Sequence, residues 1–320
     1  MSLNRAFFLA LLAAVLATAS LLSLRPFIQG VGFAPDQGFN WYYWKRPDPT
    51  FWSRASVWTA YLAHQMFLWG AIFWAKKNRD RWRDRAGIHP INWIMLAGTA
   101  GFVALHYLQT AVFYDGLGQD LPVFASQASV ILLLVVVLLL EAPRRGLFLG
   151  AGKGWFAPIR QTLIATHGYY FAWATTFTFW YHPMELTGGH LLGFFYMFLL
   201  FIQAAFIFTR IHTNRIWTFV LELSVVVHAV VVAWVAGQEF WPMFAFGFLF
   251  ILVMTQMHGL GLSQRTRWSI TALVAAAAAA VYSQRGWEYV TEIIRIPAID
   301  YALVFAIGGI LLLVNRLRKN

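Results

Sequence analysis

Six ionisable side chains lie inside strongly apolar stretches of the chain. They are His64, His106, His167, His228, His258 and Glu222. Burying an ionisable group in hydrocarbon costs about 2.5 kcal/mol or more, so residues of this kind usually serve a site. An imidazole takes up and releases a proton near neutral pH, and a carboxylate can pair with it. These six residues are therefore predicted to be catalytic.

The composition defines the class of protein that must position them. Of 320 residues, 60% are hydrophobic and only 12% are charged, which predicts an all-α, polytopic integral membrane bundle. The chain has no cysteine, which excludes disulfides, thiolate metal sites and iron–sulfur clusters. The net charge of +11 fits basic cytoplasmic loops better than a nucleic-acid partner.

A membrane-spanning helix needs about 20 mostly apolar residues, and the sequence offers about ten such segments. They cover roughly 5–24, 56–75, 91–114, 122–141, 160–182, 189–209, 216–237, 242–262, 269–282 and 298–315. We expect one transmembrane domain over residues 1–320, because no stretch between these segments is long enough for a core of its own.

Charge distribution predicts the topology. With both termini in the cytoplasm, most of the 24 basic residues fall inside. These are Arg5, the run 76–85, Arg144, Arg145, Lys153, Arg160, Arg210, Arg215, Arg265, Arg267, Arg316, Arg318 and Lys319. This predicts a multi-pass protein of a bacterial-type inner membrane. The first segment also resembles a signal peptide, with cleavage after Ala17-Thr18-Ala19 as the less favoured alternative.

Counting residues from the helix ends divides the six side chains into two layers. His64, His106 and His228 fall in the outer half of the membrane, whereas His167, Glu222 and His258 fall in the inner half. We expect each layer to line a polar site, although interhelical hydrogen bonding alone is an alternative.

Three loops carry further features. Residues 25–55 are rich in Trp and Tyr, which predicts an interfacial segment or a lid over an outward-facing site. His182, Glu185 and His190 are candidate ligands for a divalent metal, with ordinary interfacial polarity as the alternative. The glycine-rich stretch 150–154 lacks the spacing of a phosphate-binding P-loop and is predicted to be a cytoplasmic loop.

The leading functional hypothesis is a membrane-embedded transferase that moves an acyl group onto a lipid or cell-envelope acceptor. Histidine would activate the acceptor hydroxyl as a base. Residues 45–64 carry Arg46, Asp48, Arg54 and His64, a run that resembles a motif of the acyltransferase-3 family of ten-helix membrane acyltransferases. The resemblance implies acyl transfer and covers these 20 residues alone. The Arg54-to-His64 gap is one residue shorter than is usual in that family, and the run precedes the second predicted span.

Two other functions are compatible with the same residues. Intramembrane histidines can hold haem or a quinone in a redox protein, so a metal ion or haem is an open cofactor assignment. Histidine and glutamate can also relay protons in a transporter, and a non-catalytic membrane subunit is a further alternative. Expected partners are membrane lipids and a lipophilic substrate, with an oligomer or larger membrane complex as an open option. The transferase hypothesis predicts that His64→Ala or His228→Ala abolishes activity without unfolding the protein.

Overall fold

The computed structural model describes residues 1–38, 41–235, 237 and 239–318. Lys319, which was placed in the cytoplasm, and residues 39–40 of the predicted outer segment lie outside this range. Regular structure in the described residues is helical, apart from one isolated antiparallel bridge between Phe148 and Ala151. The prediction of an all-α protein is confirmed.

Ten helices of 14 residues or more account for most of the described chain. They are α1 (Leu3–Ser20), α3 (Phe51–Lys77), α4 (Pro90–Phe113), α5 (Val123–Arg145), α6 (Arg160–Tyr181), α7 (Gly188–Ala205), α8 (Arg215–Val235), α9 (Trp241–Met254), α10 (Gln264–Arg285) and α11 (Arg295–Leu317). The short α2 (Arg25–Ile28) follows α1. Each of the predicted apolar segments coincides with one long helix.

Seven helical segments in the described residues are long and apolar enough to cross a membrane. They are Leu3–Ile28, Pro90–Phe113, Val123–Arg145, Gly188–Ala205, Arg215–Val235, Trp241–Gly259 and Trp287–Leu317. Helices α3, α6 and α10 are of similar length but more polar, since α3 carries Arg54 and His64 and α10 begins with Arg265 and Arg267. A multi-pass membrane protein is therefore supported by seven segments rather than ten.

Several helices begin at a side chain that can cap exposed backbone N–H groups. Thr50 accepts a hydrogen bond from the Ser53 amide at the start of α3, and Thr187 accepts one from the His190 amide at the start of α7. At α4, His89 and Asn92 form a reciprocal capping box ahead of Pro90. These residues set where α3, α4 and α7 start, and therefore how many residues separate each helix start from its histidine.

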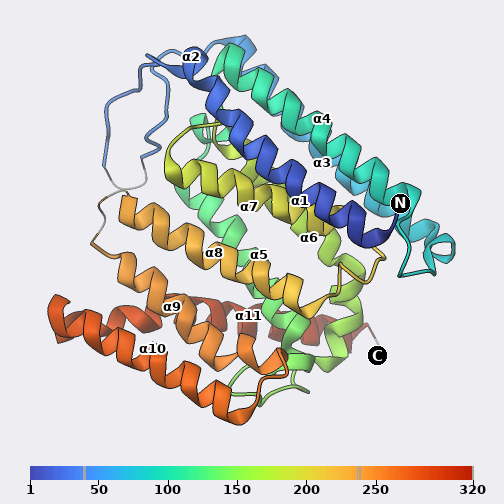
Figure 1. The fold of residues 1–320 in the computed structure, drawn as a ribbon, viewed down its shortest axis with the longest axis vertical. Helices are drawn as coiled ribbons and strands as arrows, with labels where there is room; N and C mark the ends of the chain where they lie inside the picture. The colour runs from blue at the N-terminus through green and yellow to red at the C-terminus, as the bar shows by residue number, and fades with distance from the viewer. Residues whose placement is uncertain (39–40, 236, 238, 319–320) are drawn as a thin grey trace. The chain divides into compact units, whose positions relative to one another are not determined.

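The chain divides into two compact units, each described here by itself. Unit 1 contains Met1–Val130 and Gly168–Trp217, and unit 2 contains Ile131–His167 and Thr218–Asn320. In unit 1, α3 packs along α4, and both α1 and α4 pack on α7 (Figure 1). In unit 2, α9 contacts both α10 and α11. The expectation of a single transmembrane domain stays a prediction.

Candidate functional site

A fully buried polar group of unit 1 is a pair of histidines that share one tryptophan. Trp180, the second-to-last residue of α6, donates a hydrogen bond from Nε1 to Nδ1 of His64 on α3, at 3.2 Å. His106 on α4 stacks on the same indole, with ring centroids 4.2 Å apart and an interplanar angle of 29°. All three side chains are fully buried. Two of the predicted outer-layer residues thus lie against a common ring.

Aromatic rings enclose this pair. Phe102 stacks on His64 with centroids 4.3 Å apart, and Phe179 meets His106 edge-on at 4.7 Å. Phe179 also lies 5.9 Å from the His64 ring, so it contacts both imidazoles. Because Trp180 and Phe179 lie against both rings, this arrangement does not fit a haem held between His64 and His106. The haem assignment therefore has no support at this position.

Several polar atoms around the pair have no hydrogen-bond partner within the described residues. They are Nε2 of His64, both ring nitrogens of His106, and the side-chain amides of Gln65 and Gln109. A buried polar group left unpaired costs about 1–3 kcal/mol, so such atoms mark places where water or a substrate group binds. Sequence reasoning missed Gln65 and Trp180. The position of Gln65 directly after His64 could have indicated it as a site residue. Nothing in the sequence distinguishes Trp180 from the other tryptophans, of which the chain has 16 in all.

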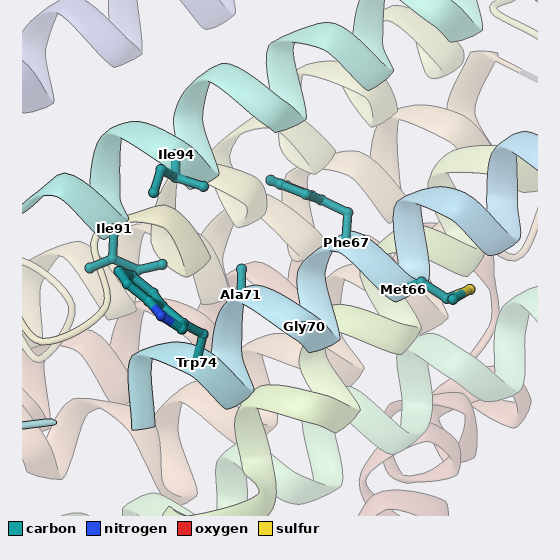
Figure 2. A pocket seen from close by; sticks show the side chains of 7 residues that line it. All are labelled: Met66, Phe67, Gly70, Ala71, Trp74, Ile91 and Ile94. Carbon is teal, nitrogen blue, oxygen red and sulfur yellow. The ribbon is translucent and has the colours of Figure 1, made fainter. Parts of the chain in front are cut away.

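A shallow hollow lies between α3 and α4 at the surface of unit 1. Figure 2 shows Met66, Phe67 and Trp74 of α3 and Ile91 and Ile94 of α4 along its walls. The Phe67 ring occupies the space where Gly98 of α4 lacks a side chain, and a Cβ at that glycine would collide with the ring. The same ring lies 5.8 Å from Phe102, which stacks on His64. Ring contacts therefore run from the hollow to the buried histidine.

An ion-pair cluster joins the loop after α4 to the start of α3. Arg54 Nη1 lies 2.7 Å from Asp115 Oδ1 and donates to the Gly116 carbonyl at 3.0 Å. Arg54 also pairs with Asp120, which accepts a hydrogen bond from Trp58 at 2.7 Å. Arg54 belongs to the run that resembles the acyltransferase motif. In this structure it holds the loop after α4 against the start of α3.

This cluster predicts a pH dependence. Partial burial alone would raise the pKa of Asp120, but hydrogen bonds from Arg54 and Trp58 hold it below its usual value. The contribution of a carboxylate with a lowered pKa is present above its unfolded value, about 3.9, and is lost as pH falls through the folded pKa. We expect amide hydrogen exchange in residues 114–122 to rise as the pH falls below about 4.

The matched variants separate this cause from general acid unfolding. Asp120→Asn should give fast exchange in residues 114–122 already at neutral pH, because the ion pair with Arg54 is gone. Asp48→Asn, at an exposed neighbouring carboxylate, should exchange like the unmodified protein. Equal exchange in Asp120→Asn and the unmodified protein would contradict the assignment.

The segment before α3 folds onto this end of unit 1. Tyr42 is buried, and its ring lies 5.5 Å from the Tyr181 ring. A Cβ at Gly118 would come within 2.7 Å of the Tyr42 ring, so the glycine lets this ring approach the loop after α4. Arg46 donates from Nη1 to the Phe113 carbonyl at 2.8 Å. Its backbone exchanges two hydrogen bonds with the Gln119 side chain, at 2.9 and 3.0 Å. These contacts fix Tyr42 and Arg46 against unit 1, and both predicted roles for residues 25–55, a lid and an interfacial segment, stay predictions.

The candidate metal ligands are not assembled as a set. The His182 and His190 rings lie 4.9 Å apart, and Trp44 contacts both, but the Glu185 carboxylate accepts hydrogen bonds from the Tyr114 hydroxyl and the Leu186 amide. Burial and this carboxylate raise the pKa of Tyr114 well above its usual value, so the hydroxyl keeps its proton. Among the described residues, no three His, Asp or Glu side chains form a metal-binding group.

The remaining predicted residues lie in unit 2. Glu222 on α8 accepts two hydrogen bonds of 2.7 Å from Arg145, the last residue of α5. Both side chains are buried, with 6% and 1% exposed, and the placement of Arg145 on the cytoplasmic side stays a prediction. His167 contacts backbone carbonyls of its own helix, and His258 contacts Arg267. His228 lies on α8, in the other unit from His64 and His106.

No protein-family profile, curated protein or solved structure matches the chain. The resemblance of residues 45–64 to the acyltransferase-3 motif therefore stays a resemblance.

Proposed function

We propose that the protein is a membrane-embedded enzyme that transfers an acyl group to a hydroxyl of a lipid or cell-envelope acceptor. The observation that supports this is the His64–His106 pair, of whose four ring nitrogens three have no partner in the described chain. Imidazole, with a pKa near 6.5 in water, suits the removal of a hydroxyl proton near neutral pH. The site would accept a lipophilic substrate, because aromatic rings surround it.

The two histidines have different roles in this proposal. Trp180 donates to Nδ1 of His64, so a neutral His64 carries its proton on Nε2 and acts as a hydrogen-bond donor there. The His182 backbone acts on the His106 ring, but no hydrogen bond of normal geometry fixes its tautomer in the described residues, which leaves one ring nitrogen able to accept a proton. We therefore assign His106 as the base and His64 as the donor to the carbonyl oxygen of the acyl group.

The chemical step balances without a further reactant. The acceptor hydroxyl attacks the acyl carbonyl as His106 takes its proton, and a new C–O bond forms. The bond between the acyl carbon and the donor then breaks, and His106 returns the proton to the departing group. The Nε2 hydrogen of His64 stabilises the negative charge that develops on the carbonyl oxygen.

We further propose that all ten long helices span a bacterial-type inner membrane with both termini in the cytoplasm. Basic residues gather at the end of unit 1 where α3 ends and α4 starts, including Lys77, Arg79, Arg81 and Arg83. The opposite end carries Asp48, Asp115, Asp120 and Glu185. This asymmetry is the one that the positive-inside rule describes.

Activity measurements on purified protein in lipid nanodiscs test the proposal. A labelled acyl thioester is supplied as donor, and transfer to the lipid fraction is counted. His106→Ala and His106→Gln should both reduce transfer by about 100-fold or more, because neither supplies a base. His64→Gln should retain more activity than His64→Ala, since its amide can still donate a hydrogen bond.

Two controls complete this experiment. Trp180→Phe keeps a ring beside His106 but removes the donor to His64, so a smaller loss is expected than for His64→Ala. His212→Ala changes a histidine that contacts the Gln203 carbonyl, away from the pair, and should leave transfer unchanged. His228→Ala shows whether the third predicted outer histidine contributes. Full activity of both His106 variants would refute the assignment.

A further inference from the structure

The glycine-rich stretch after α5 is folded into a defined turn in unit 2. Leu147 donates its amide to the Ala151 carbonyl at 2.7 Å, and Leu149 donates to the Met254 carbonyl at the end of α9, also at 2.7 Å. Gly150 and Gly152 adopt φ angles of +89° and +78°, which glycine tolerates best. A Cβ at Gly150 would lie 3.4 Å from Nδ1 of His258, so the turn lies directly beside that imidazole.

His258 holds an arginine in place at this turn. Its Nε2 lies 3.1 Å from the Val253 carbonyl, which accepts the ring proton, so Nδ1 accepts a hydrogen bond from Arg267 Nη1 at 3.0 Å. Lys153, from the turn, also acts electrostatically on the same ring. Arg267 Nε is buried and has no hydrogen-bond partner in the described residues. The neutral His258 ring thus orients Arg267, and the Nε–H group of Arg267 stays available as a hydrogen-bond donor.

The neighbouring carboxylates are already paired with other arginines. Glu141 pairs with Arg144, and Glu222 pairs with Arg145. Within the described part of unit 2, the remaining ion pair joins Arg285 to Glu292, so Arg267 and Lys153 have no carboxylate partner there. Two cations beside one imidazole, with no counter-charge, repel one another unless an anion binds between them.

We propose that Arg267, Lys153 and the turn 149–152 form a binding site for a phosphate group, with His258 as a positioning residue for Arg267. Guanidinium N–H groups match phosphate oxygens in geometry and charge, and lysine adds a point charge. The phosphate could belong to a lipid headgroup or to a soluble phosphorylated molecule. The site lies in unit 2 and does not depend on the transferase proposal.

Binding measurements in maltoside micelles, in a phosphate-free buffer, test this site. One arm titrates inorganic phosphate by calorimetry. The second arm compares phosphatidylglycerol with diacylglycerol by native mass spectrometry, since the two lipids differ by the phosphate headgroup. Arg267→Gln and Lys153→Gln should each weaken binding by about tenfold, the loss expected for one charge-assisted contact.

Arg265→Gln is the matched control, because Arg265 lies on the same turn of α10 and is exposed. It should bind as the unmodified protein does. If the unmodified protein binds inorganic phosphate and Arg267→Gln does not, the site takes a soluble phosphate. If it binds phosphatidylglycerol and Arg267→Gln does not, the site takes a lipid headgroup. Absence of binding in both arms, or equal weakening by Arg265→Gln, overturns the proposal. Lys153 is exposed on the turn, so Lys153→Gln keeps the test valid if Arg267→Gln does not fold.

Discussion

Replacing Arg145 by methionine is expected to lower the free energy of unfolding by about 3–5 kcal/mol. The substitution leaves the Glu222 carboxylate buried without the two 2.7 Å hydrogen bonds that now compensate its charge. Glu141, which lies 3.4 Å from Arg145 Nε, loses a neighbour as well. Thermal unfolding in detergent, followed by tryptophan fluorescence or circular dichroism, measures the loss.

The double variant Arg145→Met with Glu222→Met distinguishes two causes of lost stability. One is a buried Glu222 charge left without its partner, and the other is poor packing of methionine at position 145. Removing both charges also removes their desolvation penalty, so the double variant should be more stable than Arg145→Met alone. Arg83→Met is the control at an exposed ion pair, where the side chains of Arg83 and Asp80 are 82% and 89% exposed. It should change stability by less than about 1 kcal/mol. A double variant no more stable than the single one would contradict the assignment.

Gly116→Ala is expected to give the second large effect. A Cβ at Gly116 would collide with the Tyr181 carbonyl oxygen and lie 2.9 Å from the His182 carbonyl carbon. These are backbone atoms, so the loop after α4 must move away from the end of α6. Overpacking of this kind costs about 1–3 kcal/mol. The same movement should weaken the ion pairs of Asp115 and Asp120 with Arg54 and displace Trp180, which precedes Tyr181.

Two readouts follow Gly116→Ala. The unfolding temperature in detergent should fall, and amide exchange in residues 114–122 should rise at neutral pH. Gly101→Ala is the control, because no atom lies within 4 Å of a Cβ placed on Gly101 in α4. Alanine is favoured over glycine in a helix by about 1 kcal/mol, so this control should be neutral or slightly stabilising. A normal unfolding temperature in Gly116→Ala would refute the close contact.

The sequence predicts the helices well because apolar runs are long and are separated by Gly, Pro and charged residues. It also identifies His64 and His106, since buried imidazoles are expensive wherever the helices pack. It does not reveal Trp180, because one tryptophan among 16 carries no local signal until its hydrogen bond is seen. The charge distribution places Arg145 on the cytoplasmic side, and only its partner on α8 shows that the side chain is buried.

The depth argument leaves a different question open. Counting residues from a helix end gives the height of a side chain in the membrane but not which helices are neighbours. His228 is predicted at the height of His64 and His106 and belongs to unit 2, so its place in the outer layer stays a prediction. Likewise, His167, Glu222 and His258 share a height, but Glu222 is bound by Arg145 and His258 by Arg267. Partner choice depends on contacts between segments far apart in sequence.

The contact between Phe67 and Gly98 also has a mechanical consequence. One aromatic ring, seated against bare backbone, sets the spacing between α3, which carries His64, and α4, which carries His106 (Figure 2). Phe67 borders the hollow between α3 and α4, so we expect a lipid chain or a substitution that shifts this ring to change the separation of the two helices. We therefore expect the distance between the imidazoles to depend partly on Phe67, a residue at the surface of unit 1.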